Sequence, residues 1–500
     1  MIAKAQFAIP NDLVSARNLV GGEWASAISK ETFPIRSPIT GETLAEVPSC
    51  SLADVDKAVA AAKSAFPKYR SMPVYERSEL LLRMAQLIRE NIEPIAAVLT
   101  LEQGKPFKSE AVPEVAETAL NFQLAGEDVV RMEGILFPLK DSHKRMLCFR
   151  EPIGVMATIT PWNFPTVIPA EYIAPGLVVG NTMVMKPSPN TPLSMIMVAQ
   201  LIQQALEEFG CPSGVFNLLT APGADVPRAM TMHPDVGLIG FTGQSATGEA
   251  IEKQAGLKQT LMELGGNGPH IVCADANLKA AAKAAALGAY FNAGQVCCAT
   301  ERILVDKRVH DDFMGELLSA TEEWRLGDPR LEDTNVGPLN NEPVAKKTTT
   351  HLEDALKKGA RIITGGSIDG GRPTDLYFPP TIIDGVKRDM LLNREETFGP
   401  VAPVLTFEDS AEALEVASET GYGLQMSVFT SSMNTAFYFI DNLRTGNLVV
   451  NDTACWWETA TPFGGGGSTR SGHGRLGGRF VLEDLTYMKT ATIDFTNVAK

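Results

Sequence analysis

Residues 181–220, NTMVMKPSPNTPLSMIMVAQLIQQALEEFGCPSGVFNLLT, place two short apolar runs on either side of a longer one. NTMVMKPS and GVFNLLT have the length and composition of buried strands, and both are bounded by turn-forming residues. The run between them, SMIMVAQLIQQALEEFG, has the length of a helix. A strand, a helix and a second strand in this order predict a parallel sheet with its helix packed on one face.

The same alternation continues in both directions from this unit. IGVMATIT and VGLIGFTG are predicted strands, and a second alternating region runs from about 265 to 478. Before residue 150, Ser51 and Asp54 form a capping-box pattern ahead of an Ala-rich helix, and helical periodicity follows. The sequence therefore predicts an α/β protein whose parallel sheets are covered by helices on both faces.

Size and charge narrow the class of protein. Five hundred residues suggest two or three domains, and 44% hydrophobic with 21% charged residues is typical of a globular protein. The net charge of −15 argues against binding nucleic acid or an anionic membrane. The first residues lack the apolar core of a signal peptide, and no run approaches the roughly 20 apolar residues of a membrane span. We expect a soluble cytoplasmic enzyme.

Cysteine usage predicts reduced thiols and no metal site. The seven cysteines are scattered without a CxxC pair, and the six histidines are not at metal spacing. FNAGQVCCAT, residues 291–300, sets Cys297 beside Cys298. Adjacent Cα atoms about 3.8 Å apart suit a disulfide poorly. By themselves these residues leave packing and nucleophilic roles open, and a nucleophile needs help because a free thiol is only about 3% ionised at pH 7.

Four other short stretches contain side chains that could act in catalysis or bind a nucleotide. Glu263 in LMELGGNGPHIV lies among apolar residues that raise the pKa of a carboxyl toward that of a general base, although pairing with a cation is an alternative. Asn163 in TITPWNFP is either an oxyanion donor or a turn residue. GFTGQSATG places a glycine-rich turn directly after a strand, as in nucleotide-binding turns. Lys186 ends another strand, and its side chain either binds a nucleotide or is a solvated charge.

Together these stretches resemble the aldehyde dehydrogenase superfamily from about residue 20 to 490. Asn163, Lys186, FTGQSATG, Glu263 in ELGG, FNAGQVC, EETFGPV and PFGG occur in the family's order and at its separations. The resemblance implies a Rossmann-like cofactor domain, an α/β catalytic domain and a β oligomerisation arm. It also implies that Cys297, two places after Gln295, is the nucleophile and that Cys298 is its packed neighbour.

The implied chemistry is oxidation of an aldehyde to a carboxylic acid. Cys297 forms a thiohemiacetal and then a thioester, Asn163 and the Cys297 backbone N–H hold the oxyanion, and Glu263 activates the hydrolytic water. Members that transfer the acyl group to coenzyme A generally lack a glutamate here. An acyl-CoA-forming semialdehyde dehydrogenase, a succinate-semialdehyde-type enzyme and a non-catalytic binding or structural protein are the alternatives.

NAD or NADP is the implied cofactor. Pro189 stands where NAD-preferring relatives often carry a glutamate, and Gln244 replaces the usual Ser or Thr. The residues expected to bind the nucleotide are Thr160, Pro161, Trp162, Lys186, Ser188, Gly243, Gln244, Gly248, Leu264, Glu396 and Phe398.

For the substrate, an arginine that binds the carboxylate of succinate semialdehyde in relatives is replaced by Glu171, which disfavours an acidic aldehyde. We expect an aromatic slot for an aryl or apolar aldehyde. Its predicted lining is Phe164, Glu171, Tyr172, Cys298, Trp456, Trp457 and Phe463. The glycine-rich loop 464–474 is longer than the family's and lacks its usual lysine.

The resemblance also sets domain boundaries and partners. Segments 1–131 and 152–264 are predicted to form the NAD(P)-binding domain, and 265–478 the catalytic domain. Segments 132–151 and 479–500 form the arm, whose apolar strands would expose edges in a monomer. We therefore expect a homodimer or homotetramer that acts on a small-molecule aldehyde, with no nucleic-acid or membrane partner.

Overall fold

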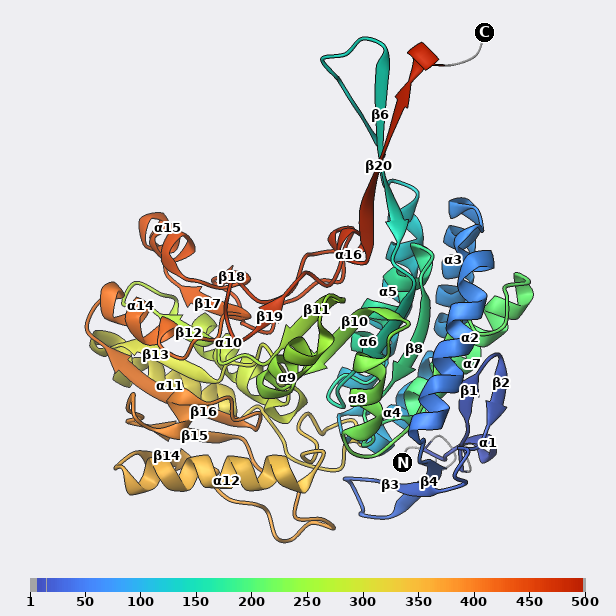
Figure 1. Ribbon diagram of the computed structural model, residues 1–500. Coiled ribbons are helices and arrows are strands. Elements are labelled where there is room, and N and C mark those ends of the chain that lie inside the picture. Colours follow the sequence, from blue (N-terminus) through green and yellow to red (C-terminus); the bar gives the residue numbers. More distant parts are fainter. Residues whose placement is uncertain (1–6, 15, 498–500) are drawn as a thin grey trace.

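The computed structural model describes residues 7–14 and 16–497, and two large sheets with their helices make up its body (Figure 1). The ends of two predicted segments, 1–6 and 498–500, lie outside the described residues. Among the described residues, no helix is long and apolar enough to cross a membrane.

The first sheet has eight strands, and its centre is parallel. In spatial order they are β19 (Gly472–His473), β11 (Gln259–Leu264), β10 (Val236–Gly243), β7 (Val155–Ile159), β8 (Thr182–Lys186), β9 (Phe216–Leu218), β1 (Asn18–Val20) and β2 (Glu23–Ala25). The strands predicted in IGVMATIT, NTMVMKPS, GVFNLLT and VGLIGFTG are β7 to β10. Strands β7 to β11 follow the doubly wound order 3-2-1-4-5, so the order reverses between β7 and β10. In such sheets a ligand crevice lies beyond the carboxyl ends of the strands at this reversal.

Helices cover both faces of this sheet, as the sequence predicts. Successive residues of a strand point to opposite faces of the sheet, and each face has its own hydrophobic core. In β7, Met156 packs in the larger core, whereas Val155 and Ala157 pack in the core on the opposite face. The larger core is formed with α3 (Val74–Glu90), α4 (Ile92–Gln103), α5 (Val112–Val129), α6 (Val167–Val178) and α7 (Leu193–Glu208). The opposite core is formed with α2 (Leu52–Arg70), α8 (Asp225–Met232) and α9 (Ser245–Ala255). The predicted cap of α2 is confirmed, because the Asp54 carboxylate accepts hydrogen bonds from the backbone N–H and the hydroxyl of Ser51.

The second sheet has seven strands and is parallel except at β14. Its order is β14 (Arg361–Thr364), β15 (Thr381–Asp384), β16 (Val401–Phe407), β13 (Arg302–Asp306), β12 (Pro269–Val272), β17 (Gln425–Phe429) and β18 (Asn447–Val450). One face packs on α10 (Leu278–Tyr290) and α11 (His310–Thr321). The other packs on α12 (Glu342–Lys357), α14 (Ser410–Ser418) and α15 (Met433–Asn442).

The glycine-rich loop connects the two sheets. Residues 472–473 lie inside the range predicted for the catalytic domain, yet they form β19 and pair with β11 at the edge of the first sheet. Gly472 has φ +92, and a Cβ there would collide with the Met262 carbonyl oxygen. Only glycine permits this close approach, so the loop supports strand β11, which carries Glu263.

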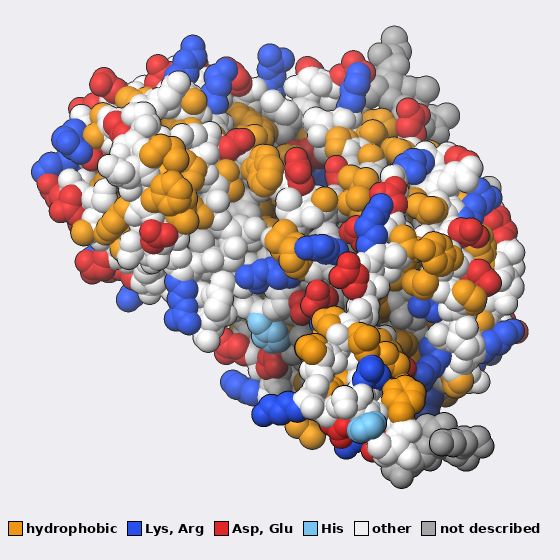
Figure 2. Space-filling view, turned by 90° about the horizontal axis from the view of Figure 1, so that it is seen from above, with side chains coloured by type: hydrophobic (Ala, Val, Ile, Leu, Met, Phe, Trp, Pro, Cys, Tyr) orange, Lys and Arg blue, Asp and Glu red, His pale blue; other side chains and the backbone are white. Residues whose placement is uncertain are grey.

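A three-stranded sheet projects from the body (Figure 1). It consists of β5 (Ile135–Phe137), β6 (Lys144–Pro152) and β20 (Thr486–Asp494), so both segments predicted to form the arm contain strands. Several of its apolar side chains are exposed, among them Leu136 at 59% and Met488 at 51%. Figure 2 looks down on the face that carries this projection and shows hydrophobic side chains among charges of both signs.

Candidate active site

Two cavities meet at Cys297. One of about 380 Å³ lies at the carboxyl ends of β7, β10 and β11, and a second of about 260 Å³ lies against α5 and α6. Ile168, Glu263 and Cys297 line both. A reactive group in the larger cavity and a small molecule in the smaller one therefore approach the same sulfur from two sides.

A strained turn places this sulfur. Helix α10 stops at Tyr290, and Asn292 and Ala293 then take left-handed φ values of 49° and 55°. Gly294 also has positive φ, and a Cβ there would collide with the Gly399 carbonyl. Gln295 fixes the turn, since its Nε2 donates to the Asn292 carbonyl over 2.8 Å and its Oε1 accepts from the Asn340 N–H over 2.8 Å. Backbone strain of this kind persists only where surrounding contacts enforce it.

Asn163 and the Cys297 N–H are available as donors beside the sulfur. The Asn163 Nδ2 donates one hydrogen bond to the Gln295 carbonyl over 3.1 Å, which leaves its second N–H unspent. The backbone carbonyl of Asn163 accepts hydrogen bonds from the Lys105 Nζ over 2.8 Å and from the Asn292 Nδ2 over 3.1 Å, and these contacts hold the residue in place. In the part of the chain that the structure describes, the Cys297 backbone N–H has no acceptor. These two groups can serve a developing oxyanion.

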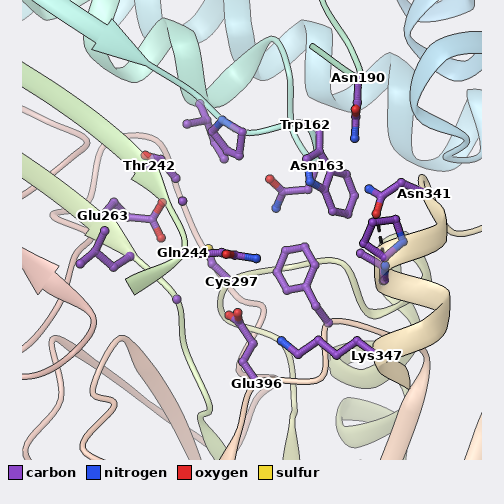
Figure 3. Close-up of a pocket in the computed structure, with 18 residues that line it drawn as sticks. Trp162, Asn163, Asn190, Thr242, Gln244, Glu263, Cys297, Asn341, Lys347 and Glu396 are labelled. Carbon is purple, nitrogen blue, oxygen red and sulfur yellow. Dashed lines mark hydrogen bonds between the residues drawn. The ribbon is translucent and has the colours of Figure 1, made fainter. Parts of the chain in front are cut away.

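Glu263 is poised to exchange a proton near neutral pH. It is 3% exposed at the end of β11, and its Oε1 has no hydrogen-bond partner among the described residues. Burial raises the pKa of this carboxyl to about 7, although the Cys297 thiol and the Thr242 hydroxyl oppose the rise. The carboxyl lies near the sulfur (Figure 3) and is not paired with a lysine or arginine in the described structure, which disfavours the ion-pair alternative.

The two adjacent cysteines differ in access. Cys297 is partly exposed to both cavities, whereas Cys298 is 6% exposed and lines only the smaller one. All seven cysteines are free. A hydrogen bond to Cys298, burial and the charge of Glu263 raise the pKa of the Cys297 thiol well above its usual value. The resting thiol is therefore protonated.

The larger cavity contains most of the residues expected to bind a nucleotide. Pro161, Trp162, Gly243, Gln244, Leu264, Glu396 and Phe398 line it, together with Asn190, Thr242, Asn341 and Lys347, which the sequence did not reveal. Figure 3 shows Glu263, Cys297 and Glu396 on one side of this cavity and Asn190 and Asn341 on the other. The lining does not include Thr160, Lys186, Ser188 or Gly248. Lys186 is 3% exposed and donates to the Pro187 carbonyl, and Gly248 lies in α9 against Leu264.

The chemistry of this cavity fits a dinucleotide. It opens at the sheet's order reversal, and the N-terminus of α9, which favours anions, begins directly after Gly243 and Gln244. The Glu396 carboxylate offers acceptors for ribose hydroxyls, and Lys347 offers a cation. A Cβ at Gly265 would lie 3.0 Å from the Glu396 Oε1, so this glycine leaves room for the carboxylate.

Phe398 forms a second strained point in the cavity wall. Its φ is +63, and its ring meets Trp162 edge to face with centroids 5.5 Å apart. The Glu301 carboxylate accepts the N–H groups of Thr397 and Phe398, each over 2.8 Å, and so enforces this conformation. The two rings give the cavity a rigid aromatic side.

The smaller cavity brings together five of the seven residues predicted to line a substrate slot. Phe164, Glu171, Cys298, Trp457 and Phe463 line it. Tyr172 does not line it: this side chain is fully buried, and its hydroxyl is hydrogen-bonded to Thr242 over 2.8 Å. Trp456 is 44% exposed and lies outside the lining, because neighbouring residues in this loop face opposite ways.

Sequence reasoning missed an acidic side of this cavity. Glu110, Glu114 and Glu117 line it, as do Phe291 and Val296. The three glutamates recur at i, i+4 and i+7, a spacing that puts them on one helical face and would have revealed them as a group.

Comparison with known proteins defines the class. Residues 24–491 match the aldehyde dehydrogenase family. The chain is 37% identical over 481 residues to the 3-sulfolactaldehyde dehydrogenase of Pseudomonas putida, covering 95% of this chain and 96% of that protein. The chain belongs to the aldehyde dehydrogenase family.

Two further relatives bear on the cofactor. The succinate-semialdehyde dehydrogenase GabD of Escherichia coli K12, named for NADP(+), is 34% identical over 483 residues, which cover 96% of this chain and 98% of that protein. The structure of an NAD-dependent aldehyde dehydrogenase from Sinorhizobium meliloti matches with a TM-score of 0.93 at 34% identity, covering 100% of this chain and 98% of that one. The protein is an oxidoreductase that acts on aldehydes with NAD or NADP.

Proposed function

We propose that the protein oxidises a small aldehyde to the free carboxylic acid, with Cys297 as nucleophile, Asn163 as oxyanion donor and Glu263 as general base. The Cys297 thiol gives up its proton to solvent, its sulfur bonds to the aldehyde carbon, and the electron pair of the carbonyl π bond passes to the oxygen, which becomes an oxyanion. The second N–H of the Asn163 amide and the unspent Cys297 N–H donate to it. The convergence of these groups where two cavities meet carries the proposal.

The nicotinamide, when bound, supplies the acceptor for the hydride that leaves this carbon. Trp162, Phe398 and the start of α9 would hold the cofactor in the larger cavity, with Glu396 and Lys347 binding its polar groups. Water then attacks the thioester on Cys297, and Glu263 takes the proton from that water. The carbon–sulfur bond breaks, the acid leaves, and the departing thiolate takes up a proton to restore the thiol.

Two cysteine variants test these roles. Cys297→Ala should abolish oxidation while calorimetry shows unchanged NAD or NADP binding, because the sulfur is needed only for chemistry. Cys298→Ala is the matched control and should keep most of the turnover. The proposal would be refuted if Cys297→Ala kept the wild-type turnover. It would also be refuted if Cys298→Ala lost its turnover while Cys297→Ala did not.

Two alternatives make different predictions. An acyl-CoA-forming semialdehyde dehydrogenase would be accelerated by coenzyme A, whereas a buried glutamate next to the nucleophile favours hydrolysis. A succinate-semialdehyde-type activity is suggested by relatives such as GabD. Glu171 in the smaller cavity argues against it, because a carboxylate there repels a second one.

We also propose the oligomer and the setting in which the enzyme works. Segments 1–131 and 152–264 bind the cofactor, 265–478 carries the nucleophile, and the projecting sheet joins subunits into a dimer or tetramer. Its exposed apolar side chains, such as Ile135 and Leu147 at 48% and 41%, support an interface there. The free cysteines support a reducing compartment such as the cytoplasm. Sedimentation of the arm variant Leu136→Lys tests the assembly and should show smaller species.

A further inference from the structure

The smaller cavity is lined by five glutamates, and among the described residues no lysine, arginine or histidine lines it. They are Glu110, Glu114, Glu117, Glu171 and Glu263. Glu263 is assigned to hydrolysis, and the remaining four differ in how their carboxylates are satisfied.

Glu110 and Glu114 have structural partners. The Glu114 carboxylate pairs with the buried Lys105 ammonium over 2.5 Å and accepts the Thr166 N–H over 3.0 Å, so it fixes the start of α6. Glu110 accepts the Asn292 N–H over 3.2 Å and helps to hold the nucleophile's turn. Glu117 is partly exposed and accepts the Thr459 hydroxyl. These contacts account for Glu114, for Glu117 and for one oxygen of Glu110, whose Oε2 has no hydrogen-bond partner among the described residues.

No comparable contact explains the burial of Glu171. It is 6% exposed, it lies on α6 one turn beyond Ile168, and that residue lines both cavities. In the described structure, neither a hydrogen-bond donor nor a cation meets its carboxylate. Burial and the charge of Glu263 raise its pKa well above the usual value. Burying an unpartnered carboxyl is costly, and the fold gains nothing visible from it.

The rest of the wall suits a cation. Phe164, Phe291, Trp457 and Phe463 line the same cavity. Aromatic faces attract ammonium groups, and combinations of aromatic rings with carboxylates bind alkylated ammonium ions. The Phe164 ring already accepts one cation, since the Lys105 Nζ lies 3.8 Å from its centroid.

We propose, building on the function proposed above, that the substrate is a short aldehyde bearing a positively charged nitrogen, which binds the Glu171 carboxylate against the aromatic wall. The volume of about 260 Å³ limits the substrate to a small molecule. Because α6 advances about 1.5 Å per residue, Glu171 lies only about one helical turn from the junction where Cys297 reacts. A few carbon atoms thus separate the aldehyde from the nitrogen.

Isosteric pairs of aldehydes test the charge alone. Trimethylammonioacetaldehyde and 3,3-dimethylbutanal differ only by nitrogen in place of carbon, and 3-aminopropanal pairs with butanal in the same way. The wild-type kcat/KM should favour the cation of at least one pair by about 10- to 100-fold, as expected for a charge-assisted contact. The pair with the larger cation-to-neutral ratio of kcat/KM shows whether the site prefers a quaternary ammonium group or a primary one. The anion 4-oxobutanoate should be the poorest substrate, and ratios near one for both pairs would overturn the proposal.

Glu171→Gln keeps the shape of the side chain and removes its charge. It should reduce the cation-to-neutral ratio of kcat/KM to near one. The control Glu458→Gln removes an exposed charge next to Trp457, outside the cavity lining, and should leave the ratio unchanged. An unchanged ratio in Glu171→Gln, or an equal loss in Glu458→Gln, refutes recognition by Glu171.

Binding without chemistry separates this proposal from the reaction it builds on. Tetramethylammonium, titrated into the wild-type protein by calorimetry at constant ionic strength, should bind and should compete with 3,3-dimethylbutanal. If no aldehyde is oxidised but this cation binds in a Glu171-dependent manner, the proposed oxidation fails and the cation site stands. If neutral aldehydes are oxidised but the cation does not bind, the oxidation stands and the cation site fails.

Discussion

Hydrolysis of the acyl-enzyme should follow the ionisation of Glu263. Burial raises the pKa of this carboxyl to about 7 from an ordinary 4.5. Because the pKa is raised, the group is protonated below pH 7, and its capacity to accept a proton is lost as the pH falls. The ionised fraction is about one eleventh at pH 6 and about ten elevenths at pH 8, so hydrolysis should accelerate about tenfold between them.

Pre-steady-state burst kinetics isolates this step. Mixing enzyme and NAD or NADP with excess aldehyde should give a rapid burst of reduced cofactor, followed by a slower phase set by thioester hydrolysis. Glu263→Gln should keep the burst and lose at least about 100-fold in the slow phase, since general-base catalysis contributes that much. Its residual rate should be flat from pH 6 to 8. A wild-type midpoint near pH 4.5, or a tenfold pH dependence retained in the variant, would show that another group is titrating.

Three further changes test the supports of the site. Asn163→Ala should lower kcat/KM about 100- to 1,000-fold with unchanged nucleotide affinity by calorimetry, and a loss below tenfold would remove it as an oxyanion donor. Gly472→Ala should lower both thermal stability and kcat, because its Cβ would collide with the Met262 carbonyl and displace the strand carrying the base; wild-type values in both assays would contradict this. Lys105→Met should destabilise the protein by about 3–5 kcal/mol in denaturant unfolding, because Glu114 is left unpaired in the core, and adding Glu114→Gln should recover much of the loss. No recovery in the double variant would show that the pair is not the cause.

Local patterns were sufficient for the elements of the fold. The strands β7 to β10 are short apolar runs between turn residues, and the cap at Ser51 involves only a residue three places away. Such features depend on nearest neighbours along the chain, which the sequence displays directly. The turn at Asn292 was missed because an alanine at positive φ breaks the local preference, and only distant partners such as Gly399 and Asn340 enforce it.

Motif spacing was sufficient to name Cys297, Glu263 and Asn163, but it could not place the walls around them. Side-chain direction decided that Trp457 and not Trp456 lines the substrate cavity, and that Tyr172 bonds to Thr242 in the core. No spacing along the chain fixes such directions, because they follow from how helices and loops rotate when they pack.

The sequence by itself determined the α/β class and the family, and it supplied the residues that we propose to react, since these depend on local periodicity and on short motifs. Only the tertiary structure decided that a strand from residues 472–473 supports the base, and that helices α5 and α6 bring Glu171 beside aromatic rings from three separate segments. The reason is physical: charge and burial in a cavity are properties of groups that meet in space after folding, and a chain read in order does not contain those distances.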